Sequence, residues 1–337
     1  WGVEPMAALG HSLGEYAAAY AAGIMSLEDA MRVVIARGRG AALCAGHGGM
    51  AAVSAPREVI DRGLAKIGDL EIAGQNAPQD FVVSGAPEAI AALAAFVQGE
   101  GGRAKVLPVP FGSHSRWVEP ALPTLAAALS QVSFHPSNLA LAANVSGALA
   151  GPEEMSTADY WVSQMRSPVR FAEGIEALSA LGITHYVEIG SHPALCAAGV
   201  ECLGDRPKWI ASMRREGSAW TDLLEGVQRL FVDGARIDWR GFDAGYGRVR
   251  LAAPTYPFQR TRHWIDAPAT APASAPAGVL WARTNAAAER QSGDGPLGLD
   301  AAAYPARWAL LERIALAQTV TLLRGAGLVQ VVVRVVG

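Results

Sequence analysis

The chain has 337 residues, a formal net charge of −3 and 51% hydrophobic residues. This length accommodates two compact domains and a linker, and the weak charge does not favour a nucleic acid or a membrane surface as a partner. No uninterrupted apolar run reaches the roughly 20 residues that cross a bilayer. The three cysteines form neither a metal-ligand spacing nor a disulfide framework. We expect a cytoplasmic protein with no metal and no signal peptide.

The segment Gly10-His-Ser-Leu-Gly-Glu15 contains the Gly-x-Ser-x-Gly pattern of a nucleophile elbow. It follows a short apolar run, Met6 to Leu9, and precedes an alanine-rich stretch, Tyr16 to Ala22. A strand, a sharp turn and a helix in this order expose the serine hydroxyl, and the helix start offers free N–H groups to an oxyanion. The pattern predicts Ser12 as a nucleophile and the backbone N–H of Leu13 as an oxyanion donor.

A second helix is predicted from Ser26, a suitable N-cap with Asp29 three residues on, to about Leu43. An alternating unit follows, with strands at 50–54, 70–73, 81–84 and 104–109 and helices at 57–67 and 87–98. The order βαββαβ is that of a ferredoxin-like subdomain, which we expect to be inserted into a larger unit.

The larger unit then continues, with helices predicted at 119–129, 157–165, 171–181 and 220–233 and strands at 139–145 and 185–189. From Arg248 the prolines favour extended chain, and 267–277 is a Pro/Ala/Ser linker. A further helix is predicted from 300 to about 325, and Val329 to Gly337 is a β-prone run.

These elements predict an α/β fold, a hydrolase-like parallel-sheet core with the ferredoxin-like insert. We expect the core to comprise residues 1–49, with the elbow, and 111–247, with the subdomain at 50–110 between them. Two linkers are expected at 248–265 and 266–295, and the helical start of a following region at 296–337. The chain opens at Trp1, directly before an interior-type strand, and we expect it to be part of a longer protein.

A serine hydroxyl is a weak nucleophile until a base takes its proton, and that base is most often histidine. His114 is the best candidate among seven histidines, because it lies between a predicted strand and helix in the small-residue segment Gly112-Ser-His-Ser115. From this context alone an ordinary loop histidine remains an equal alternative.

The elbow, the Arg37-Gly-Arg39 segment, the βαββαβ unit and Gly112 to Ser115 together resemble malonyl-CoA:acyl-carrier-protein transacylases. More narrowly, they resemble the acyltransferase domain of modular type I polyketide synthases. Three further stretches, each quoted by its ends, carry the same resemblance: Tyr160–Phe171, Val187–Pro193 and Pro254–Arg260. The resemblance covers about residues 1–265.

This resemblance implies ping-pong chemistry in polyketide biosynthesis. Ser12 attacks the thioester of an acyl-CoA with His114 as its base, and the acyl group passes to the phosphopantetheine thiol of an acyl carrier protein. A ketosynthase and other synthase domains are the implied neighbours, and no tightly bound cofactor is implied.

Further site residues follow from the resemblance. Gln164 matches the position whose backbone carbonyl orients the imidazole, with a helix-end surface residue as the alternative. Arg37 matches the arginine that grips the free carboxylate of a malonyl group, for which a guanidinium offers bidentate hydrogen bonds. A solvated helix arginine is the alternative there. His11, Phe111 and Ser113 complete the expected substrate-binding set, although an elbow turns the His11 side chain away from the nucleophile.

The extender unit stays open between malonyl and methylmalonyl or another substituted malonyl. Ser113, directly before the histidine, matches the roomier pattern of methylmalonyl-selective members. Leu13 points to malonyl. Residues 296–337 weakly resemble the helical lead-in of a methyltransferase domain, with an unassigned interdomain helix as the alternative. A methyltransferase would also favour malonyl, because methylation could then supply the branch. We lean towards a substituted malonyl, because the residues around the histidine touch the substrate.

Two rival functions also stay open. The resemblance implies an earlier Gly-Gln-Gly strand turn with a second oxyanion donor, which this chain lacks, and one such donor typically contributes about two to three orders of magnitude in rate. The rivals are a proofreading serine acyl hydrolase and a catalytically incomplete remnant that acts as a scaffold.

Overall fold

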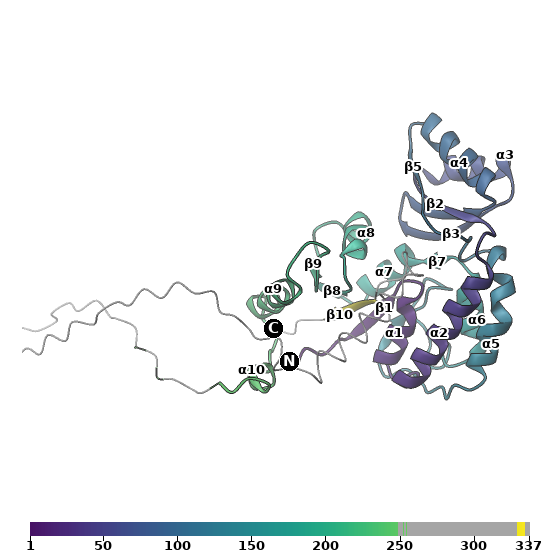
Figure 1. Ribbon diagram of the computed structural model, residues 1–337. Helices are drawn as coiled ribbons and strands as arrows, with labels where there is room; N and C mark the ends of the chain where they lie inside the picture. Colours follow the sequence, from purple (N-terminus) through teal and green to yellow (C-terminus); the bar gives the residue numbers. More distant parts are fainter. Residues whose placement is uncertain (249–251, 253, 255–328, 334–337) are drawn as a thin grey trace, which may run out of the picture.

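The computed structural model describes residues 1–248, 252, 254 and 329–333, which form two five-stranded sheets with their helices (Figure 1). The first sheet has the order β6-β1-β10-β8-β9. Its strands span Ala140–Ala142, Ala7–Gly10, Val329–Val333, His185–Ile189 and Lys208–Ala211 in that order. β1 runs parallel to β6 and β8 runs parallel to β9, whereas β10 is antiparallel to both β1 and β8. The predicted parallel-sheet core is therefore confirmed for four of the strands.

β10 lies in the β-prone run at 329–337, and its place between β1 and β8 was not predicted. Val329 pairs with both Gly10 and Ile189, and Val332 pairs with Ala7 and Tyr186. β10 thus joins the two halves of the sheet. Its pairing with β1 extends to Gly10, two residues before Ser12.

Helices cover both faces of β1, whose residues are all buried. Ala8 contributes to a core with Tyr16, Leu125 and Trp161, from α1 (Gly14–Ala21), α5 (Leu122–Leu129) and α6 (Ala158–Arg166). Ala7 and Leu9 face the opposite core, which α7 (Phe171–Ser179) and α8 (Ala194–Leu203) complete. This alternation explains the continuous apolar run of β1, since a strand covered on both sides reads as apolar throughout.

The remaining helices frame these layers. α2 (Leu27–Leu43) begins at the predicted N-cap, where the Asp29 N–H donates to Ser26 Oγ at 3.0 Å. The predicted helix at 119–129 is divided into a short 3-10 helix, η1 (Arg116–Ala121), and α5, because Pro120 lacks an N–H. In Figure 1, α9 (Ala219–Val232) and α10 (Trp239–Asp243) lie towards the N-terminal end of β1, away from α1 and α2.

The second sheet belongs to the predicted ferredoxin-like subdomain, which is confirmed. Its order is β5-β2-β4-β3-β7, with strands Arg103–Val106, Gly49–Ser54, Asp80–Gly85, Leu70–Ala77 and Val169–Arg170. The helices α3 (Arg57–Ile67) and α4 (Pro87–Gly99) contribute Ile60, Ile90 and Leu93 to its separate core. β7 comes from the larger unit and pairs in parallel with β3, at Gly74↔Val169, so the two units share a strand contact.

Four elements were not predicted, namely β7, α8, β9 and α10. β6 ends at Ala142 rather than Val145, because the chain turns there with the Ala143 N–H bonded to the Ala148 carbonyl at 2.9 Å. The predicted linkers at 248–265 and 266–295 and the helix at 300–325 lie outside the described residues, apart from positions 248, 252 and 254.

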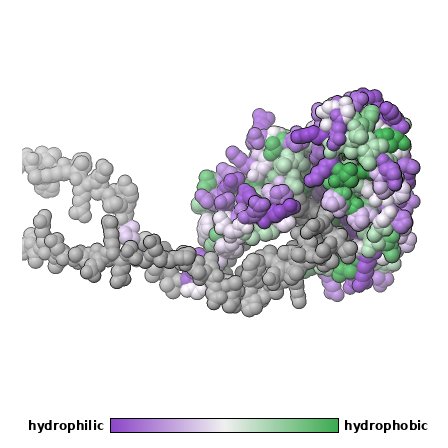
Figure 2. All heavy atoms as spheres, turned by 45° about the horizontal axis from the view of Figure 1, so that its top comes forward, coloured by the Kyte–Doolittle hydropathy of each residue, from purple (hydrophilic) through white to green (hydrophobic). Residues whose placement is uncertain are grey.

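Within the described residues no helix combines the length and the apolar character that crossing a membrane requires. Hydrophilic and hydrophobic residues intermix over the surface that Figure 2 shows. The large exposed apolar side chains are distributed over several elements, for example Leu43 on α2, Val106 on β5 and Val232 on α9.

Candidate active site

The chain makes a sharp turn between β1 and α1, as the elbow pattern predicts. Ser12 adopts φ +53°, in the left-handed region that is uncommon for a residue with a side chain. A Cβ on Gly10 would lie 2.2 Å from Glu15 Cα, so only glycine fits before the turn. The Gly14 N–H donates to the His11 carbonyl at 2.9 Å and closes the turn.

Ser12 and His114 lie within hydrogen-bond reach of each other. Ser12 Oγ is 2.6 Å from His114 Nε2, and His114 Nδ1 is 2.8 Å from the Ser167 carbonyl oxygen. A carbonyl oxygen can only accept, so Nδ1 carries the proton and Nε2 presents a lone pair to the Ser12 hydroxyl. This tautomer is the one in which an imidazole can take a proton from serine.

The Gln164 carbonyl contributes less to the orientation of His114 than expected. The carbonyl at 2.8 Å from Nδ1 belongs to Ser167, the first residue after α6, and the Gln164 carbonyl adds a smaller interaction with His114. The Gln164 side chain instead donates from Nε2 to the Ser12 carbonyl at 2.8 Å. Gln164 is 1% exposed, so the alternative of a helix-end surface residue is wrong.

Arg37 lies against the nucleophile from α2. Its Nη2 donates to Ser12 Oγ at 2.9 Å, and its guanidinium carbon is 5.3 Å from the centroid of the Tyr16 ring. Arg37 is 7% exposed, whereas Arg32 on the same helix is paired with Glu28 and Asp29 at the surface. The alternative of a solvated arginine is therefore wrong. Nη1 of Arg37 is buried and has no hydrogen-bond partner among the described residues.

Burial and charge keep His114 neutral. Burial and, to a smaller extent, the nearby positive charge of Arg37 lower the pKa of His114 to about 3, against the opposing effect of the Ser167 carbonyl. His114 is therefore in its unprotonated form at neutral pH. Burial also lowers the pKa of His11, and the hydrogen bond from its ring to Asn76 Oδ1 opposes this shift.

The N–H of Leu13 is available at the start of α1. The three following N–H groups donate to the carbonyls of His11, Ser12 and Leu13. Leu13 is the N-cap of α1, and within the described part of the chain its own N–H has no acceptor. A free N–H beside the nucleophile suits an oxyanion, as predicted for Leu13.

The other substrate-binding candidates lie around this turn without direct contact to Ser12 Oγ. His11 Nε2 is 2.8 Å from Asn76 Oδ1 on β3, and the His11 ring packs against Phe171. Phe111 is partly buried and packs against the core that contains Tyr16 and Trp161. The Ser113 carbonyl accepts from Ser84 Oγ of β4 at 2.6 Å, which ties the His114 loop to the subdomain.

Two residues that hold the elbow were missed by the sequence analysis. The buried Asn144 side chain bonds both Gly10 and Ser12, and the buried Glu15 carboxylate accepts from Asn144 and Tyr160. Glu15 ends the elbow segment, and its charged side chain in an alanine-rich helix start was the available signal. Asn144 lies near the end of the strand predicted at 139–145, where a polar residue gives little indication of its partner.

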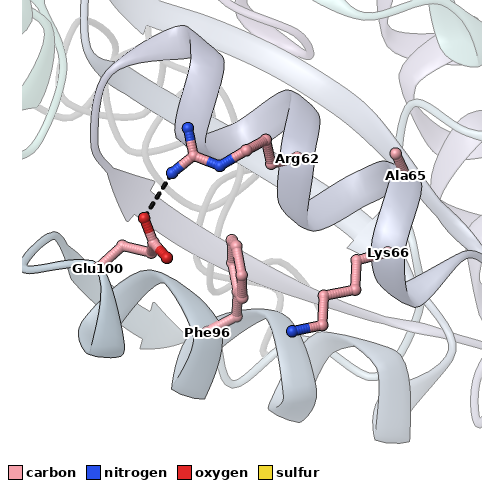
Figure 3. Close-up of a pocket in the computed structure, with 5 residues that line it drawn as sticks. All are labelled: Arg62, Ala65, Lys66, Phe96 and Glu100. Atoms are coloured by element: carbon pink, nitrogen blue, oxygen red, sulfur yellow. Dashed lines mark hydrogen bonds and ion pairs between the residues drawn. The ribbon is translucent and has the colours of Figure 1, made fainter.

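A separate hollow of about 480 Å³ lies between α3 and α4, lined by Arg62, Ala65, Lys66, Phe96 and Glu100 (Figure 3). Arg62 pairs with Glu100 across it, and Lys66 Nζ lies 5.4 Å from the Phe96 ring centroid. None of these residues contacts Ser12 or His114. Over the same described residues, no three His, Cys, Asp or Glu side chains gather where a metal could bind.

Comparison with known proteins agrees with the geometry. The acyl transferase domain family matches residues 1–237. The spectinabilin polyketide synthase system protein NorB of Streptomyces orinoci is 37% identical over 282 residues, which make up 82% of this chain and 13% of that protein. The chain thus spans a small part of this curated relative.

Solved structures show the same fold. The acyltransferase domain from the second module of the salinomycin polyketide synthase aligns with a TM-score of 0.69 and 30% identity, over 76% of this chain and 61% of that one. The malonyl CoA-acyl carrier protein transacylase from Clostridium perfringens aligns with a TM-score of 0.62 and 28% identity, over 68% and 74%. By its sequence and its fold, the chain belongs to the acyl transferase domain family of polyketide synthases and malonyl transacylases.

Proposed function

We propose that the chain selects a malonyl-type extender unit from acyl-CoA and transfers it, through an ester on Ser12, to the phosphopantetheine thiol of an acyl carrier protein. The observation that carries the proposal is the array of Ser12, His114 and the Ser167 carbonyl, with Arg37 at Ser12 Oγ. In this proposal residues 1–49 and 111–247 form the catalytic core and 50–110 the subdomain beside it. The carrier protein and neighbouring synthase domains are the partners, since the curated relatives include polyketide synthases.

In the first half-reaction the neutral His114 takes the Ser12 proton on Nε2 as Oγ attacks the thioester carbonyl carbon. The negative charge that develops on the carbonyl oxygen is stabilised by the Leu13 N–H. The intermediate collapses by breaking the carbon–sulfur bond, and the coenzyme A thiolate receives the proton from His114. The Ser167 carbonyl holds the Nδ1 proton throughout and stabilises the imidazolium.

The second half-reaction reverses these steps. His114 takes the proton of the phosphopantetheine thiol, and the thiolate attacks the ester carbon. The carbon–oxygen bond to Ser12 breaks, and Oγ recovers its proton from His114. Transfer to water instead of the thiol would be the hydrolase reaction, so the acceptor distinguishes the two functions.

Arg37 supports an acyl group that carries a carboxylate. A buried guanidinium with one unpartnered nitrogen beside the nucleophile is an unfavourable arrangement that a carboxylate would satisfy. A bound carboxylate would also offset the positive charge that lowers the pKa of His114, and so strengthen the base when the correct acyl group is present.

The extender choice remains a proposal, with a lean towards a substituted malonyl. Ser113 is small and precedes the base directly, while Phe111 packs into the core rather than filling that position. One methyl group is worth only about 1–3 kcal/mol of discrimination, so competition between malonyl-CoA and methylmalonyl-CoA in one reaction measures the preference. A strong preference for malonyl would contradict the lean.

The direct test is intact-mass detection of the acyl adduct after incubation with malonyl-CoA. The wild-type chain should gain one malonyl group, and Ser12→Ala should gain none, because no other hydroxyl is placed on the elbow. Addition of phosphopantetheinylated carrier protein should discharge the adduct onto the thiol. An adduct that persists in Ser12→Ala would refute the nucleophile, and discharge to water alone would favour the hydrolase.

A further inference from the structure

Ser12 is held in a backbone conformation that a serine rarely adopts. Its φ of +53° persists only where the surrounding contacts fix it. The Ser12 carbonyl accepts from the Glu15 N–H at 3.1 Å and from Gln164 Nε2 at 2.8 Å. The Ser12 N–H donates to a single acceptor, Asn144 Oδ1, at 2.8 Å.

Asn144 bonds four residues through its four polar groups. Its Oδ1 accepts from Ser12, and its Nδ2 donates to the Gly10 carbonyl at 2.6 Å. Its own N–H donates to Glu15 Oε1 at 2.7 Å, and its carbonyl accepts from the Arg170 N–H at 3.0 Å. Asn144 itself is 1% exposed, so its polar groups are shielded from water.

The two hydrogen bonds of the Asn144 carboxamide continue the contact between β6 and β1 beyond the point where their main-chain pairing ends. β6 pairs with β1 up to Leu9↔Ala142, and beyond this point the β6 chain turns away while β1 enters the elbow. A primary amide offers one donor and one acceptor in a plane, as a peptide group does. The side chain of Asn144 thereby bonds Gly10 and Ser12 on either side of His11.

Glu15 holds Asn144 in turn. Its Oε1 accepts from the Asn144 N–H and from Tyr160 Oη at 2.7 Å, on the helix that also carries Gln164. Glu15 is 1% exposed, and its Oε2 has no partner within the described part of the chain. The carboxyl therefore connects the start of α1 to Asn144 and to α6.

We propose that Asn144 is a positioning residue that fixes the main chain of the nucleophile in its left-handed conformation, with Glu15 fixing the orientation of Asn144. The reaction through which Asn144 acts is the one proposed above, so this inference rests on that function. The placement of the Ser12 hydroxyl between His114 and Arg37 depends on this conformation, because φ of Ser12 sets the direction of its side chain.

Two variants test the role, with Asn138→Ala as the matched control. Asn138 is exposed and lies in the loop before β6. Asn144→Ala removes both elbow bonds, and a displaced nucleophile typically costs about 100-fold, so acylation of Ser12 should slow by that factor. Asn138→Ala should retain the wild-type rate.

Asn144→Asp should make the rate of Ser12 acylation depend on pH, which a general loss of stability would not do. The protonated acid offers the donor and acceptor that Asn144 offers, whereas the carboxylate loses the donor to Gly10. Glu15 from α1, Tyr160 from α6 and Arg37 from α2 face this region and are common to variant and wild type. The ratio of the two acylation rates should therefore recover as the pH falls from 8.5 to 5.

Amide hydrogen exchange at Ser12 in the full chain separates this inference from the proposed function. Exchange of the Ser12 N–H should become at least tenfold faster in Asn144→Ala and stay unchanged in Asn138→Ala. If the wild-type chain takes no acyl group, the proposed function fails, and the exchange rate still decides the role of Asn144. Unchanged exchange in Asn144→Ala, or an Asn144→Asp rate ratio that does not vary with pH, would overturn the inference.

Discussion

Replacement of Glu15 by glutamine should make the stability of the protein less dependent on pH. Burial raises the pKa of Glu15 from its ordinary value of 4.5 to about 7, although the Asn144 N–H and the Tyr160 hydroxyl favour the carboxylate. The folded protein therefore holds this proton more tightly than the unfolded chain does. The resulting stabilisation is complete below pH 4.5 and is lost as the pH rises through 7.

The size of the effect follows from the two pKa values. The interval between 4.5 and about 7, at about 1.4 kcal/mol per pH unit, corresponds to about 3 kcal/mol in the free energy of unfolding. Glutamine keeps an oxygen for Asn144 and Tyr160 but has no proton to lose. Wild type should thus lose about 3 kcal/mol in the free energy of unfolding from pH 4 to pH 8 through this carboxyl, and Glu15→Gln should not. The difference between variant and wild type should therefore change by about 3 kcal/mol in favour of the variant.

Urea-induced unfolding of both proteins at the two pH values measures this difference. His114 acts in the opposite sense, because its pKa is lowered to about 3 and its contribution rises with pH, but it is present in both proteins and cancels. Glu28→Gln serves as the control, since it removes a carboxyl whose side chain is 86% exposed. A Glu15→Gln difference that stays the same at pH 4 and pH 8 would refute the assignment of a buried, proton-binding carboxyl.

Three further predictions concern the proposed chemistry. His114→Ala should slow adduct formation by roughly two to four orders of magnitude in a time course of acylation followed by intact mass, and a rate near that of wild type would exclude His114 as the base. Arg37→Ala should impair malonyl-CoA far more than acetyl-CoA, because only the former carries a carboxylate; equal losses would make Arg37 a structural residue. Ser113→Phe should shift loading from methylmalonyl-CoA towards malonyl-CoA in a competition assay, and an unchanged ratio would show that this loop does not set selectivity.

The parts of the fold that sequence patterns could predict are those built from local signals. The elbow combines two glycines, an apolar strand and an alanine-rich helix, and each of these is read within a few residues. The α3 helix was predicted at its observed bounds, Arg57–Ile67, because its apolar positions repeat at helical spacing between two short strands. Neither signal depends on the partner across the sheet.

Contacts between distant segments were harder to predict. The last carbonyls of α6 and the carbonyl of Ser167 after it are free of helical partners, and the resemblance pointed to Gln164, whereas packing places the Ser167 carbonyl at His114 Nδ1. The place of β10 depends on sheet pairing between residues more than 300 positions apart along the chain. The hydrogen bonds of Asn144 and Glu15 form only when the segment after β6 packs against α1 and α6, so the local sequence does not predict them.

The subdomain is part of the site because it holds both sides of the histidine. Ser84 of β4 donates to the carbonyl of Ser113, the residue directly before His114. The carbonyl that orients the imidazole belongs to Ser167, and two residues later β7 pairs with β3 of the same subdomain sheet. Ser12, in contrast, is carried by β1 of the first sheet. The distance between nucleophile and base is therefore set by how the two sheets are joined, and a change in their relative position would move His114 away from Ser12 without any change in either residue.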